Sequence, residues 1–104
     1  MKNHYITVVN NIATYSERGG SIVCGRNDHQ VTFVFDHIWS AYPDKIARFK
    51  WNGGFVDVPI VNDTAEIPVI ENAKHVEVGV YVEGLHATTP TVIPCKEDDG
   101  HEES

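Results

Sequence analysis

The side chains that most often do chemistry in proteins are spread thinly along this sequence. None of the six histidines lies at the short paired spacing of a strong zinc motif. They are His4, His29, His37, His75, His86 and His101. No glycine-rich phosphate loop leads into a helix and no nucleophile elbow is present. The acids are spread along the chain, so a catalytic carboxylate pair would form only by coincidence of the fold. The sequence therefore predicts a non-enzymatic protein with no cofactor and no metal site.

The two cysteines, Cys24 and Cys95, are the next candidates. With Trp39 fifteen residues after the first, they follow the Cys, Trp, Cys order of an immunoglobulin domain, in which a disulfide links two sheets. Ile93 stands where such domains carry a tyrosine, two residues before the second cysteine. A bridge would contribute about 4 kcal/mol. Because the sequence shows no export signal, we instead expect two reduced, mostly buried thiols.

The segment "FDHIWSAYPDK", residues 35–45, concentrates aromatic side chains between two strand-like runs. Trp39 and Tyr42 combine a large apolar ring with a polar atom, and Tyr-Pro-Asp places proline at the second position of a turn. The rings either close one end of a β-sandwich or form an exposed platform on which sugars stack. We favour the first interpretation, and the second leaves glycan binding as an alternative function.

The segment "FKWNGGFVDV", residues 49–58, predicts a β-hairpin, because Asn-Gly is a strong turn signal. A three-residue loop would mix polar and apolar side chains on both faces, whereas a two-residue turn at residues 52–53 gives each face a consistent character. The resulting pairs are Ala47 with Val58, Arg48 with Asp57, Phe49 with Val56 and Lys50 with Phe55. A turn at residues 53–54 would keep the same faces.

Strand parity separates the two aromatic residues that flank this turn. Trp51 falls on the apolar face, in the core or at its rim, whereas Phe55 falls on the charged face. We expect the Phe55 ring to lie over the aliphatic stem of Lys50 or to contact another chain. The candidate interaction surface comprises Phe55, Lys50, Arg48, Trp39 and Tyr42.

Alternation of apolar and polar residues dominates the rest of the chain. "HVEVGVYV" is typical of a half-buried strand, and "QVTFVF", apolar on both faces, of a central one. Other strand-like runs are "HYITVV", "GSIVCG", "KIARFKW", "FVDVPIV", "AEIPVI" and "TPTVIPCK". Only "DHIWSAY" and "VIENAK" allow a turn of helix. We predict an all-β fold, a single antiparallel β-sandwich of seven or eight short strands with an immunoglobulin-like arrangement.

Four prolines, Pro59, Pro68, Pro90 and Pro94, interrupt or bracket strand-like runs. Because proline donates no backbone hydrogen bond, we expect the strands that carry them to lie at sheet edges or to contain bulges.

Composition and charge limit the size of the fold and the class of partner. A chain of 104 residues that is 41% hydrophobic and 22% charged fits one domain, which we assign to residues 1–95. The net charge is −7, and an acidic, flexible tail over residues 96–104 contributes −4 of it. No basic stripe favours nucleic acid, and no run approaches the ~20 apolar residues of a membrane span.

Several segments together resemble small virion proteins of tailed bacteriophages that infect Gram-positive bacteria. They are "VCG", "VTFVFD", "IWSAYPDKIARFKWNG", "VDVPI", "EIPVI", "VEVGVY" and "ATTPTVIPCK", within residues 22–96. Such proteins are immunoglobulin-like or baseplate-type β-sandwich modules. The resemblance implies a structural protein of the tail, baseplate or capsid decoration, made in the host cytoplasm and incorporated into the virion. Its partners would be other virion proteins and copies of itself. The alternative is a carbohydrate-binding module for host-surface recognition.

Overall fold

The chain folds into short β-strands joined by tight turns, as seen in a computed structural model that describes residues 1–16 and 20–97. Its elements are β1 (Lys2–Val9), β2 (Ile12–Ser16), β3 (Ile22–Val23), β4 (His29–Phe35), α1 (His37–Ser40), β5 (Ile46–Trp51), β6 (Gly54–Pro59), β7 (Thr64–Glu66), β8 (His75–Val82), β9 (His86–Ala87) and β10 (Thr91–Lys96). The predicted all-β class is confirmed. The described residues form ten strands, two of them only two residues long, against the seven or eight expected.

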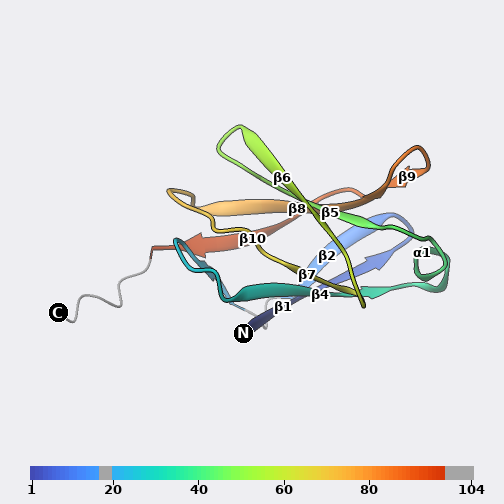
Figure 1. Cartoon of the computed structure of the whole chain (residues 1–104), viewed down its shortest axis with the longest axis horizontal. Helices are drawn as coiled ribbons and strands as arrows, with labels where there is room; N and C mark the ends of the chain where they lie inside the picture. The colour runs from blue at the N-terminus through green and yellow to red at the C-terminus, as the bar shows by residue number, and fades with distance from the viewer. Residues whose placement is uncertain (17–19, 98–104) are drawn as a thin grey trace.

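The strands form two sheets that pack face to face. One has the order β2-β1-β4-β7, and the other has the order β3-β10-β8-β5-β6, with β9 pairing with β8. In Figure 1 the four-stranded sheet lies along the lower side of the molecule, and β5, β6, β8 and β9 lie along the upper side. Apolar side chains from both sheets meet between them in one core.

Two strand pairs differ from the fully antiparallel sheets that the sequence suggested. β1 pairs in parallel with β4, and β10 pairs in parallel with β3. After the β1–β2 hairpin the chain passes to the other sheet as β3 and then returns as β4 on the free side of β1. This crossover makes β4 run in the same direction as β1.

Alternating residues build the core, as the period of two predicted. On β8 every second residue from Val76 to Val82 is buried. Ile6 and Val8 on β1 and Phe33 on β4 approach the core from the other sheet. Burying one such aliphatic or aromatic side chain stabilises the fold by about 1.5–3 kcal/mol, so the paired faces hold the two sheets together.

The β5–β6 hairpin has the predicted register. Asn52 and Gly53 both have positive φ, 53° and 83°, as a two-residue type I′ turn requires. The pairs Arg48 with Asp57 and Phe49 with Val56 are confirmed, as are the other two. Trp51 is half-buried against the core, so its predicted place at the core rim is also confirmed.

The short helix α1 lies in the segment where one helical turn was expected, whereas residues 69–74, the other candidate, form none. Asp36 caps α1 by accepting a hydrogen bond from the backbone N–H of Trp39 at 2.9 Å. With four residues α1 is far too short to cross a bilayer, and the described part of the chain contains no helix that is long and apolar enough to do so.

The prolines behave in two ways. Pro59 ends β6, an edge strand, as expected. Pro94 lies in β10, which has neighbours on both sides, so its predicted edge position is wrong. The next residue, Cys95, donates its N–H toward the β8 side, to Lys74, so the nitrogen of Pro94 faces the other side. On that side β3 pairs only with Cys95 and Lys96, so no strand lies opposite the Pro94 nitrogen and the sheet needs no N–H donor there.

Lys96 is the last residue of β10, close to the predicted domain boundary at residue 95. Of the predicted tail, residues 98–104 lie outside the described residues.

Candidate functional site

Four side chains on the outer face of the six-stranded sheet form a connected group, which we call the Arg48 cluster: Arg48 of β5, Phe55 and Asp57 of β6, and Tyr81 of β8. Arg48 donates from Nε to Asp57 Oδ1 at 2.8 Å and from a terminal nitrogen to Oδ2 at 2.9 Å. Tyr81 Oη donates to the same Oδ2 at 2.8 Å. This bidentate geometry fixes the guanidinium plane.

The Arg48 guanidinium also lies over two aromatic rings. Its Cζ is 4.0 Å from the centroid of the Phe55 ring and 4.9 Å from that of Tyr81. We had expected the stem of Lys50 under Phe55, and the structure places Arg48 there instead. A planar, weakly hydrated guanidinium stacks on a ring better than an ammonium does. The Phe55 side chain nevertheless stays 56% exposed.

Hydrogen bonding sets the ionisation of this cluster. The Arg48 hydrogen bonds hold the pKa of the Asp57 carboxyl below its usual value, and the Tyr81 hydroxyl adds to that effect. In turn, donation to Asp57 raises the pKa of Tyr81, and the same partner raises the pKa of Arg48. At neutral pH the cluster is therefore a fixed ion pair with a neutral tyrosine, which suits recognition better than proton transfer.

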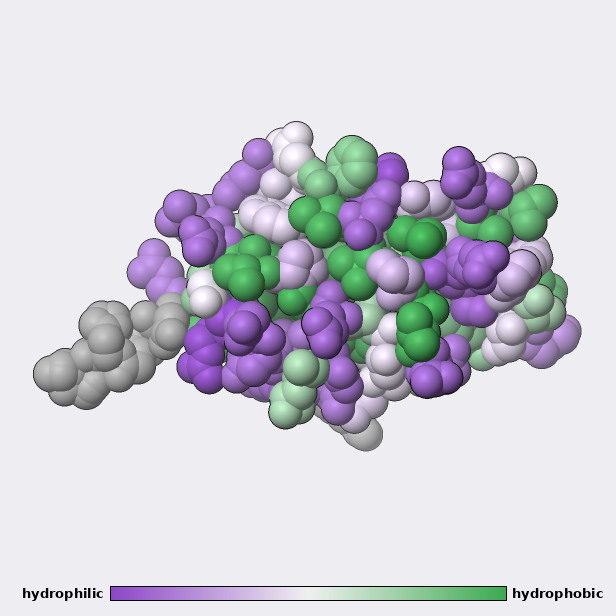
Figure 2. Space-filling view, in the orientation of Figure 1, coloured by the Kyte–Doolittle hydropathy of each residue, from purple (hydrophilic) through white to green (hydrophobic). Residues whose placement is uncertain are grey.

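Lys50 is exposed beside this cluster, paired with Phe55 on one side and with Glu77 on the other. A groove of about 530 Å³ runs past it over β8, between β5 and the segment that follows β8. Gly79 and Tyr81 line the groove on β8, and Leu85, which is largely exposed, lines it on the far side. Figure 2 shows apolar residues interspersed with hydrophilic ones over the region that Figure 1 assigns to β5, β6 and β8.

Trp39 does not belong to this surface. The Trp39 side chain is 1% exposed, so its assignment to an exposed interaction surface is wrong. Its Nε1 donates to Asn11 Oδ1 at 2.8 Å, and its ring packs edge-on against Tyr42 with centroids 5.3 Å apart. Tyr42 is half-buried. The indole fills the end of the sandwich because α1 turns it inward, which is the interpretation that we favoured.

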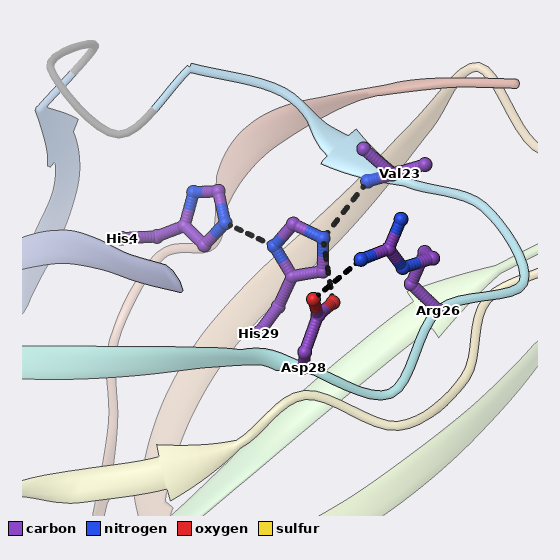
Figure 3. A network of polar contacts seen from close by, with 5 residues as sticks. All are labelled: His4, Val23, Arg26, Asp28 and His29. Carbon is purple, nitrogen blue, oxygen red and sulfur yellow. Dashed lines mark hydrogen bonds and ion pairs between the residues drawn. The ribbon is translucent and has the colours of Figure 1, made fainter. Parts of the chain in front are cut away.

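A second polar site, buried between β1 and β4, was missed by the sequence reasoning. The side chains of His4 and His29 are 0% and 3% exposed, and His4 Nε2 lies 2.8 Å from His29 Nδ1. Figure 3 shows His29 between the His4 ring on one side and Val23 and Asp28 on the other. Parallel pairing brings the two strands together, with His29 opposite Lys2 and His4 opposite Val31.

Hydrogen-bond partners fix the tautomers of both rings. The backbone N–H of Val23 donates to His29 Nε2 at 3.2 Å, so the ring proton of His29 sits on Nδ1 and is donated to His4. His4 must then donate from Nδ1 to the hydroxyl of Tyr15, 3.2 Å away. Tyr15 donates onward to the backbone carbonyl of Gly20. The result is a one-way chain of hydrogen bonds between neutral rings.

Burial explains why these rings stay neutral. Desolvation lowers the pKa of His4 to about 4, and repulsion from His29 in its protonated form and from Lys2 adds to this shift. Burial also lowers the pKa of His29, although Asp28 opposes this shift from 3.7 Å. Asp28 Oδ1 is buried and, within the described residues, accepts no hydrogen bond. Protonation of His29 at Nε2 would take away the acceptor of the Val23 N–H.

The two cysteines are free thiols and half-buried, which agrees with the expected reduced pair. Burial raises the pKa of the Cys95 thiol to about 11, so it is not a thiolate nucleophile at neutral pH. Over residues 1–16 and 20–97, no three or more histidines, cysteines or acids cluster in a way that could hold a metal ion.

Comparison of the chain with protein-family models, with curated proteins and with solved structures found no match in any of the three.

Proposed function

We propose that this chain is a non-enzymatic assembly module that acts through protein–protein contacts. The observation that carries the proposal is Phe55, an exposed ring held in one orientation by Arg48. Arginine and aromatic side chains are enriched where protein interfaces concentrate their binding energy. Since Asp57 and Tyr81 already fix the Arg48 guanidinium, little side-chain entropy remains to be lost when a partner covers the ring.

We further propose that the module is a component of a tailed-phage virion, synthesised in the host cytoplasm and assembled with other virion proteins and copies of itself. This step rests on the resemblance of residues 22–96 to such proteins. A small β-sandwich with an exposed aromatic contact is compatible with it, because virion shells and tails repeat one contact by symmetry.

The alternative function, glycan binding, relied mainly on Trp39 as an exposed ring and is no longer supported by that residue. Stacking on a sugar requires an exposed ring face, whereas the Trp39 indole is buried and its Nε1 is bound by Asn11.

The test is incorporation into particles. Particles purified on a density gradient from a lysate of cells carrying the gene are digested and analysed by quantitative mass spectrometry, and we expect this chain at a fixed stoichiometry. In a phage that carries the gene for this chain, that gene is then silenced and replaced by one encoding Phe55→Ser or the control Val34→Ser. Val34 is 54% exposed on the other sheet, so it matches Phe55 in exposure.

We expect the control to enter particles at the wild-type level and Phe55→Ser to be depleted, with both variants folded by circular dichroism. Absence of the chain from particles would contradict the virion proposal. Equal incorporation of the two variants would contradict the role of Phe55.

A further inference from the structure

The longest strand edge left open in the described chain belongs to β6. This strand ends the six-stranded sheet, and five of its six residues are exposed, Val58 being half-buried. The edge strand β2 of the other sheet differs, because Thr89 bridges Ile12 and the Thr91 hydroxyl accepts from the backbone N–H of Tyr15. An open edge presents unpaired backbone groups to any strand that fits it.

Hairpin geometry identifies these groups. In a two-residue hairpin the residues that flank the turn form a hydrogen-bonded pair, and such pairs then recur at every second position. The N–H of Ile60 donates to the carbonyl of Lys45, which confirms that the even-numbered residues of β6 point their backbone groups toward β5. The N–H and C=O of Phe55 and Asp57 therefore point outward. Pro59 has a carbonyl there but no N–H.

These outward groups suit a second copy of the same strand running antiparallel. If a two-fold axis passes through Val56, Phe55 of one copy lies opposite Asp57 of the other, and the N–H and C=O of both residues are paired in each strand. An axis at Asp57 would put two carboxylates side by side and place Phe55 opposite Pro59, which lacks a donor. An axis at Phe55 would pair only Phe55 with itself and would place Asp57 opposite the turn.

The side chains favour the same register. Across the axis Val56, 39% exposed, would meet its own copy as a close non-hydrogen-bonded pair. On the outer face the Phe55 ring would lie beside Asp57 of the second copy. A charge on an edge strand normally blocks pairing, but each Asp57 is already neutralised by its own Arg48. Asp57 therefore does not prevent another strand from pairing with this edge.

We infer that two copies of this chain join their six-stranded sheets by antiparallel pairing of β6 about a two-fold axis at Val56. This inference names the partner for the proposed assembly function and rests on it. Because the contact consists of four backbone hydrogen bonds and a few side chains, the isolated dimer is weak, and repeated symmetry in a larger assembly strengthens it.

Cysteine crosslinking in solution tests the register. In a background with Cys24→Ser and Cys95→Ala, a single Val56→Cys substitution brings two thiols together at the axis, where the Cα spacing of a non-hydrogen-bonded pair permits a disulfide. Under mild oxidation we expect Val56→Cys to form covalent dimers about tenfold faster or more than the matched control Val34→Cys. Equal rates for the two variants would overturn the inference. Faster crosslinking of Asp57→Cys than of Val56→Cys would overturn the register.

A second measurement does not depend on the cysteine substitutions. Sedimentation velocity of the wild-type chain at rising concentration is expected to show a monomer–dimer equilibrium. Val56→Lys should abolish it by placing two ammonium groups at the axis, whereas Val34→Lys should leave it intact. A wild-type chain that stays monomeric, or equal behaviour of the two variants, would overturn the inference. Since these experiments need no particles, failure of the dimer is distinguishable from failure of the virion proposal.

Discussion

Acidification should destabilise this protein through its buried histidine pair. His4 has a pKa of about 4 in the folded chain against an ordinary 6.5. Between these two values the unfolded chain binds a proton that the folded chain excludes, so the free energy of unfolding falls as the pH falls. Below about pH 4 both states are protonated at this residue, and its contribution is lost. At 1.36 kcal/mol per pH unit, His4 alone accounts for about 3 kcal/mol.

The assay is a series of urea melts between pH 7.5 and 4.5 at constant ionic strength. In His4→Gln the amide oxygen can still accept from His29, but the titrating ring is gone. We expect this variant to be less stable than the wild type at pH 7.5 and to lose much less stability on acidification. His75→Gln, which removes an exposed histidine from β8, is the matched control.

Two carboxyls with shifted pKa values act in a lower pH range. The pKa values of Asp36 and Asp57 are lowered by hydrogen bonds, from the Trp39 backbone and from Arg48 respectively. Their stabilisation is present above the unfolded value of 3.8 and is lost only as the pH falls below it. A wild-type stability that is flat from pH 6.5 to 4.5, or an unchanged slope in His4→Gln, would refute the reasoning.

Three further predictions concern stability and the Arg48 cluster. Trp39→Ala should cost about 3–5 kcal/mol in urea melts because its indole is buried, whereas Phe55→Ser should stay within about 1 kcal/mol, and equal losses would contradict this placement. Gly53→Ala should cost about 1 kcal/mol because φ is +83° there, and a neutral result would mean that the turn is not type I′. Asp57→Asn should lower the pKa of Tyr81, seen in ultraviolet titration as one tyrosine ionising at lower pH than in the wild type, and an unchanged curve would contradict the hydrogen bond.

Local pattern was enough to predict the hairpin and much of the core. Alternation placed the β8 valines inside, and the chemistry of Asn52-Gly53 fixed which of the two flanking aromatics faces the core. Both signals act over a few residues, so they survive without knowledge of the rest of the fold.

Contacts between distant strands could not be predicted in this way. The hydrogen bond from Tyr81 to Asp57 depends on β8 lying next to β5, and the His4–His29 pair depends on the parallel crossover. One local signal was available: His4 shares the parity of Ile6, and His29 shares that of Val31, so both rings follow the buried face of their strands. The stacking of Arg48 on Phe55 is diagonal across the hairpin, whereas the prediction considered only the direct neighbour, Lys50.

The parallel pairing of β1 with β4 has a consequence for folding during synthesis. β1 leaves the ribosome before β4, yet it becomes an interior strand whose second neighbour, β4, begins at His29. The Asn10-Asn11 turn allows β1 and β2 to form a hairpin within microseconds, but ribosomes add only about 5–20 residues per second. For about a second or more β1 therefore keeps an open apolar edge, and the nascent chain is most prone to aggregation in that interval.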